Sequence, residues 1–121
     1  MPKSMEIVWL YDFYGEMLTE KQRQVFELYY EQDLSLAEIA ENQNITRQGV
    51  RDAIKRAESQ MLEMEDRLHL AARFRDMHNG LEAIREAAQD IQVFNDRARF
   101  SRDIEERAVR IVRLADELKE R

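Results

Sequence analysis

Cysteine is absent from this chain of 121 residues, and the chain has only one proline and three glycines. Without cysteine it can form neither a disulfide nor a thiolate metal site. The two histidines, His69 and His78, are isolated, so we expect no metal or other cofactor. No apolar run approaches the roughly 18 residues that a membrane-spanning helix needs. The N-terminus also lacks the apolar core of a secretory signal, so we expect a cytoplasmic protein without membrane insertion.

The scarcity of helix breakers leaves a chain rich in helix-forming residues, which predicts an all-α fold. The formal net charge is −6, although coating nucleic acid nonspecifically requires many basic contacts. Any contact with nucleic acid should therefore be local. No paired nucleophile and base, phosphate-binding loop or ligand cluster is present, so we do not expect an enzyme.

Residues 35–56 predict a helix-turn-helix. Ser35 and Glu38 have the spacing of a capping box, which starts a short first helix. The turn at residues 42–44 has no apolar side chain, and asparagine tolerates the left-handed conformation that ends a helix. Thr46 then caps a second helix. We expect one apolar side for this unit, formed by Leu36, Ile39, Ala40, Ile45, Val50, Ala53, Ile54 and Ala57.

The outer side of the second helix is basic, with four Lys or Arg against one acid between Arg47 and Arg56. These side chains could meet base edges or phosphates. The candidate contact residues are Thr46, Arg47, Gln48, Arg51, Lys55 and Arg56. Asp52 would repel phosphate unless it pairs with Arg56 at i+4. Gly49 weakens the helix by up to about 1 kcal/mol, which close approach to a partner could explain. A purely structural pair of helices is the alternative.

The N-terminal thirty residues are aromatic and predict two core helices. Trp9, Leu10, Phe13 and Met17 recur at helical spacing in the first. Thr19 and Gln22 form a second capping box, and a wide apolar face follows it. A platform for stacking bases is the alternative interpretation of these rings, but helical spacing favours a core.

After Arg56 the first helix-stop signal is at residues 78–80, so the second helix of the motif is predicted to continue to about Met77. Its heptad seam comprises Val50, Ile54, Ala57, Met61, Met64, Leu68 and Ala71. That seam could pack on the first helix, on the C-terminal helices or on a second copy of the chain. We therefore expect a helix-turn-helix domain over residues 1–77 and a packing or dimerisation element over residues 78–121.

Residues 81–121 predict a helical hairpin, with a second helix that starts at Ser101. Each of its helices carries apolar residues at steps of three and four. In the first they are Leu81, Ile84, Ala88, Ile91, Phe94 and Ala98. In the second they are Ile104, Ala108, Ile111, Ala115 and Leu118.

Several short motifs resemble one known family in their order and spacing. They are Tyr11-Asp-Phe-Tyr14, Leu18-Thr-Glu-Lys-Gln-Arg23, Leu28-Tyr-Tyr30, Asp33-Leu-Ser-Leu-Ala-Glu-Ile-Ala-Glu41, Thr46-Arg-Gln-Gly-Val50 and Ile54-Lys-Arg-Ala-Glu58. Together they resemble the bacterial YlxM family over about residues 6–76. The helix-turn-helix is also similar to the DNA-reading fourth region of bacterial sigma factors.

The resemblance implies a small regulatory DNA-binding protein, whose gene typically neighbours those of the signal recognition particle GTPase and its receptor. It places the DNA contacts at four residues of the second helix and makes Thr46 the cap. These four are Arg47, Gln48, Arg51 and Lys55. The chain departs from the pattern at Gln43, where an apolar side chain is usual, and at Asn44, which replaces a turn glycine. Gly49 and Arg51 stand where alanine and tyrosine are more frequent.

Two functions compete at this point. One is a regulatory DNA-binding protein that acts as a homodimer, so that two recognition helices meet successive major grooves. The alternative is an adapter that binds the GTPase or the RNA of the signal recognition particle and does not bind DNA.

Overall fold

A computed structural model describes residues 2–120, and those residues form an all-α fold without strands, as the composition predicts. The helices are α1 (Met5–Tyr14), the short 3-10 helix η1 (Gly15–Met17), α2 (Glu20–Tyr30), α3 (Leu36–Gln43), α4 (Arg47–Leu68), α5 (Leu70–Arg97) and α6 (Arg102–Lys119). The chain divides into two compact units, the first ending at Ala72 and the second starting at Arg73. None of the helices among the described residues is long and apolar enough to cross a membrane.

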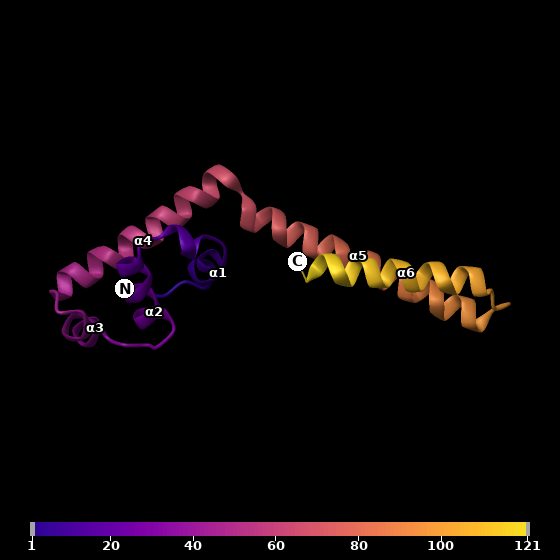
Figure 1. Ribbon diagram of the computed structural model, residues 1–121, viewed down its shortest axis with the longest axis horizontal. Coiled ribbons are helices and arrows are strands. Elements are labelled where there is room, and N and C mark those ends of the chain that lie inside the picture. Colours follow the sequence, from indigo (N-terminus) through magenta and orange to yellow (C-terminus); the bar gives the residue numbers. More distant parts are fainter. Residues whose placement is uncertain (1, 121) are drawn as a thin grey trace. The chain divides into compact units, whose positions relative to one another are not determined.

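Helix α4 is the centre of the first unit, because α1, α2 and α3 each pack against it (Figure 1). Its inner face supplies Val50, Ile54, Ala57 and Met61, all fully buried as the predicted seam requires. The first two pack with α2 and α3, whereas Ala57 and Met61 pack with α1. Met64 continues this face and is partly buried against the α1 cluster, whereas Leu68, also predicted in the seam, is exposed at the end of α4.

The aromatic residues of α1 and α2 pack in the core, as predicted. Tyr11 and Tyr30 stack on opposite sides of Phe26, with ring centroids 4.3 and 4.4 Å from that of Phe26. Burial and hydrogen bonds to Glu27 and Glu58 raise the pKa of both tyrosines, which keeps their hydroxyls protonated as donors. The prediction for Met17 was wrong. It is 72% exposed because α1 ends at Tyr14, and Tyr14 is buried in its place.

Helix α4 ends at Leu68, so the prediction of one helix continuing to about Met77 was wrong. His69 adopts the left-handed conformation, with φ of 56°, and α5 begins at Leu70. The Glu65 carboxylate accepts hydrogen bonds from the Ala71 and Ala72 amides, both at 3.0 Å, which caps the start of α5. The prediction failed because the end of α4 depends on the Glu65 side chain, which bonds to amides beyond the break at His69.

Tyr14 of α1 completes this joint, which consists of Tyr14, Glu65 and residues 69–72. Its hydroxyl donates to Glu65 at 2.6 Å and accepts from the Leu70 amide at 3.3 Å. Burial and the hydrogen bond to Glu65 raise the pKa of Tyr14. For Glu65, burial acts to raise the pKa, but hydrogen bonds from Tyr14, Ala71 and Ala72 outweigh it and hold the pKa below its usual range.

The predicted helix stop at residues 78–80 was also wrong, because α5 passes through it. Gly80 does not adopt a positive φ and has open space where a Cβ would lie. A single exposed glycine destabilises a helix by about 1 kcal/mol. The helical stability of the other residues of the 28-residue α5 outweighs this cost.

The second unit is the predicted hairpin, formed by α5 and α6, which lie side by side and antiparallel (Figure 1). Asn95 closes its turn: the side-chain amide donates to the Ser101 carbonyl at 2.8 Å and accepts from the Ser101 amide at 3.0 Å. Ser101 then caps α6, with its hydroxyl accepting from the Ile104 amide. Of the predicted apolar positions in the hairpin, only Ala88, Ala108 and Ala115 are buried.

Candidate nucleic-acid interface

Helices α3 and α4 form the helix-turn-helix, and their caps are the predicted ones. Ser35 and Glu38 make both hydrogen bonds of the capping box at 3.1 Å. Asn44 adopts the left-handed conformation, with φ of 56° and ψ of 46°, and so replaces a turn glycine without a change of backbone. The Ile45 amide bonds back to the Ala40 carbonyl at 3.1 Å, which completes a Schellman-type end to α3.

The apolar side chain after the turn joins the two helices. Ile45 is partly buried against the cluster that contains Ile39, Ala40 and Val50. This is the hydrophobic contact that accompanies such a helix end. Gln43, where related motifs bury an apolar residue, is only partly buried. Ile45 and the buried face of α3 therefore hold the crossing of the two helices.

Thr46 caps α4, with its Oγ1 accepting from the Gly49 amide at 2.9 Å. A Cβ at Gly49 would lie 3.1 Å from this oxygen, closer than most carbon contacts. Glycine at position 49 therefore leaves room for the Thr46 cap. This explains the glycine without the close approach of a partner.

We expect Thr46→Ala to lower the free energy of unfolding by about 1 kcal/mol, because the Gly49 amide loses its acceptor. Urea denaturation followed by circular dichroism measures the change. Thr46→Ser keeps the hydroxyl and serves as the control. Equal destabilisation by both substitutions would show that the hydroxyl is not responsible.

All six predicted contact residues are exposed at the N-terminal half of α4. None of the four basic ones forms an ion pair within residues 2–120. Arg47, Arg51 and Lys55 follow one another at four-residue steps, so they lie along one edge of the helix. The structure therefore leaves three neighbouring cations available to an anionic partner.

Asp52 does not form the ion pair with Arg56 that the sequence analysis left open. Its carboxylate accepts a hydrogen bond from the Gln48 side chain at 2.9 Å, one turn earlier on the same face. The bond orients the Gln48 amide at the helix start. It also leaves Arg56 without an intramolecular carboxylate partner among the described residues.

Arg56 lies apart from the other cations and lines a groove of about 620 Å³ between α4 and the start of α2. The groove is lined by Thr19, Lys21, Gln22, Ile45, Gly49, Asp52, Ala53, Arg56 and Gln60. Lys21 thus shares a surface with Arg56, although the sequence analysis did not select it. Its position in the first turn after the Thr19 cap was the available signal, since helix starts attract anions.

Within the described part of the chain, no three His, Asp or Glu side chains are grouped so that they could hold a metal ion. Apart from Asp52, which accepts a hydrogen bond from Gln48, the chemistry available at this surface is that of hydrogen-bond donors and positive charge. Both suit a polyanion.

The family described as "Putative helix-turn-helix protein, YlxM / p13 like" matches residues 1–100. The chain belongs to this family. The match includes the helix-turn-helix and extends beyond residue 76, where the resemblance in the sequence ended. The family is one of helix-turn-helix proteins rather than of enzymes.

Individual family members are similar over most of their length. A UPF0122 protein of Thermoanaerobacter sp. (strain X514) is 45% identical over 104 residues, covering 80% of this chain and 89% of that protein. One of Clostridium novyi (strain NT) is 39% identical over 106 residues, covering 88% and 92%. One of Halalkalibacterium halodurans is 44% identical over 87 residues, covering 72% and 80%.

Proposed function

We propose that this family member binds double-stranded DNA, with the N-terminal half of α4 in the major groove. The start of α4 carries the argument. A helix N-terminus favours negative charge, and α1, α2, α3 and α6 all have acids in their first turn. The first turn of α5 also has none, but the Glu65 carboxylate caps it, whereas the first turn of α4 has no acid and contains Arg47 instead. A cation at this position interacts unfavourably with the helix dipole and so destabilises α4. Such a residue is expected where the cation binds an anionic partner.

The side chains would divide between bases and phosphates. Arg47, Gln48 and Arg51 lie nearest the helix start, where a recognition helix meets base edges. Thr46 and Lys55 would contact phosphates. Arg56 would do so from the groove that it shares with Lys21. Base contacts would then set the sequence preference, and phosphate contacts the affinity and register.

We further propose that the protein acts as a homodimeric regulator. One recognition helix reads only a few base pairs, and two copies can occupy successive major grooves on one face of the duplex. The net charge of −6 supports this arrangement, since a single small cationic patch on an acidic chain binds weakly alone.

Fluorescence anisotropy of a labelled random duplex, titrated with the full chain at several salt concentrations, tests the proposal. We expect binding at low salt that weakens as salt rises. The logarithm of affinity against that of salt concentration should have a slope of about −3 to −5, corresponding to four or five phosphate contacts. Absence of binding at low salt, or binding insensitive to salt, would contradict this function.

The second candidate is an adapter of the signal recognition particle, with the same helix on its RNA or its GTPase. The clustering of Arg47, Arg51 and Lys55 near one end of α4, on a chain of net charge −6, favours a single local contact of this kind. Size-exclusion chromatography of the chain with the purified particle tests it. Separate elution of chain and particle would count against the adapter.

A further inference from the structure

The two helices of the second unit meet along a row of small and polar side chains. The buried residues of this row are Ala88, Asn95, Ala108 and Ala115. Three methyl groups and one amide bury little apolar surface, and a small helical unit normally needs a much larger core. The large apolar residues of the hairpin must therefore lie elsewhere.

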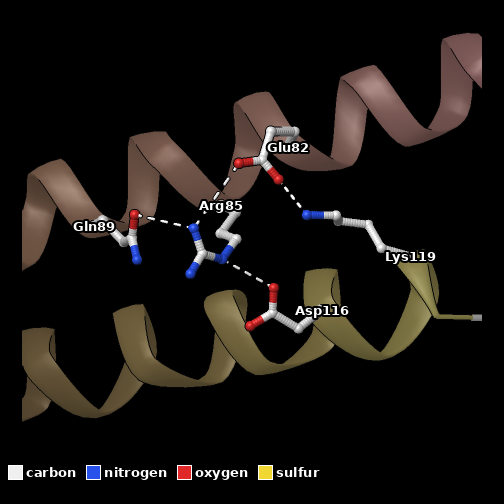
Figure 2. Close-up of polar contacts among 5 residues, drawn as sticks. All are labelled: Glu82, Arg85, Gln89, Asp116 and Lys119. Atoms are coloured by element: carbon white, nitrogen blue, oxygen red, sulfur yellow. Dashed lines mark hydrogen bonds and ion pairs between the residues drawn. The ribbon is translucent and has the colours of Figure 1, made fainter.

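One side of this row is polar. Arg85 forms an ion pair with Asp116 at 2.9 Å, and Lys119 pairs with Glu82 (Figure 2). Gln92 donates to Glu105 at 3.0 Å on the same side. Figure 2 shows that the charged groups from α5 and α6 point toward one another across the pair. These bonds pair most polar groups of this side within the hairpin itself, although Glu105 Oε2 is buried without a hydrogen-bond partner among the described residues.

The other side is apolar, and the helical repeat explains why. Residues three before and four after Ala88 are Arg85 and Gln92, whereas those four before and three after are Ile84 and Ile91. The same offsets from Ala108 give Glu105 and Val112 on the first side, and Ile104 and Ile111 on the second. In an antiparallel pair equal offsets fall on the same side of the hairpin. We call the second side the isoleucine face.

The isoleucine face is a large and regular exposed apolar surface. Its members are Ile84, Ile91, Phe94, Ile104, Ile111, Leu114 and Leu118, each 37% to 67% exposed. Together they present on the order of 600 Å² of apolar side chain, the upper end of what soluble monomers leave exposed. A stable interface buries roughly 800 Å² per partner, so the apolar residues of this face would form the greater part of such an interface.

We propose that the isoleucine face binds the same face of a second copy of this chain, forming a four-helix bundle. The inference rests on the proposed function for its role, because the bundle would join two helix-turn-helix units. The charges at the rim of the face favour a second copy as occupant. Asp90 and Arg97 on α5, and Asp103, Arg107 and Arg110 on α6, are exposed and form no ion pair within residues 2–120.

These rim charges complement one another when α5 of one copy packs antiparallel against α6 of the other. The contacts within the hairpin show which residues of α5 and α6 lie at the same height along its axis. Gln92 lies opposite Glu105, and Arg85 lies opposite Asp116. If α5 of one copy and α6 of the other are aligned along the bundle as they are within one hairpin, Asp90 lies opposite Arg107 and Arg110 of the other copy. Arg97 then lies opposite Asp103 of the other copy. A two-fold axis along the bundle repeats each pair, as a closed dimer requires.

Light scattering coupled to size-exclusion chromatography tests the dimer on the full chain. We expect a mass of twice 14.5 kDa for the wild type and a shift toward 14.5 kDa for Ile91→Glu. The dimer should weaken by about 30-fold or more, as for a central interface residue. Val93→Glu is the matched control, since Val93 lies on the same helix outside the isoleucine face, and both residues are 44% exposed. It should leave the dimer intact.

If Ile91→Glu also destabilises the hairpin, a swap of the charges at positions 90 and 110 still tests the dimer. Asp90→Arg should weaken the dimer, and adding Arg110→Asp should restore it, which loss of folding could not produce. A monomeric wild type at tens of micromolar would overturn the inference, as would equal weakening by Val93→Glu. A monomeric wild type whose binding to DNA still needs Arg47 would overturn the dimer but leave DNA binding standing. A dimer that binds no DNA would overturn the proposed function alone.

Discussion

Replacing Arg47 with glutamate is expected to weaken binding to duplex DNA by about 100-fold or more while leaving the protein at least as stable as the wild type. The loss of affinity combines a missing contact to base or phosphate with repulsion between Glu and the DNA. The gain in stability arises because a carboxylate in the first turn of α4 interacts favourably with the helix dipole, typically by 0.3–1 kcal/mol. Anisotropy titrations and urea denaturation measure the two effects on the same preparation.

The opposite signs of these two effects make the test specific. Arg67→Glu is the matched control, because Arg67 is an exposed arginine in the last turn of the same helix. It changes the net charge equally, but removes an ion pair with Glu63 at 2.9 Å far from the helix start. We expect it to lower stability slightly and to leave DNA affinity within about twofold. Equal loss of affinity in both variants would mean that overall charge, not the recognition helix, governs binding.

The caps and faces of the helix-turn-helix could be predicted because they are local. A capping box needs two residues three positions apart, and an apolar face needs only the helical repeat. Ser35 with Glu38, Thr46, and the buried Val50 and Ile54 therefore stand where the sequence placed them. The exposure of the six candidate contacts follows from the same repeat.

The failed predictions depend on contacts between residues far apart in the chain. The end of α4 requires Tyr14, which lies fifty-one positions before Glu65 in the sequence. Lys21 and Arg56 line the same groove on α4, although no local sequence pattern connects the two residues. The sequence left open, for a related reason, whether the apolar seams of the hairpin pack within the chain or between copies. Heptad spacing in α5 and α6 shows that apolar residues share a side, but not whether the alanines or the isoleucines face the neighbouring helix.

The joint between α4 and α5 provides the second large effect. Glu65→Ala should destabilise the first unit by about 2–4 kcal/mol, because it leaves the Tyr14 hydroxyl and two backbone amides without their shared acceptor. Glu63→Ala is the control, since Glu63 is exposed on the same helix and pairs only with Arg67. We expect it to cost less than about 0.5 kcal/mol. Urea denaturation of both variants at neutral pH makes the comparison.

The pH dependence of this joint follows from the pKa of Glu65. Because the folded state holds that pKa below the ordinary value of 4.5, the carboxylate contributes stability that is fully present above this value. The contribution is lost as pH falls below 4.5 and through the depressed pKa. Glu65→Gln cannot ionise, so the stability difference between wild type and this variant should shrink on acidification. Other carboxylates, such as Glu38 and Glu82, titrate in both proteins and cancel. A difference that stays constant from neutral to strongly acid pH would show that Glu65 acts at the joint through its shape rather than its charge.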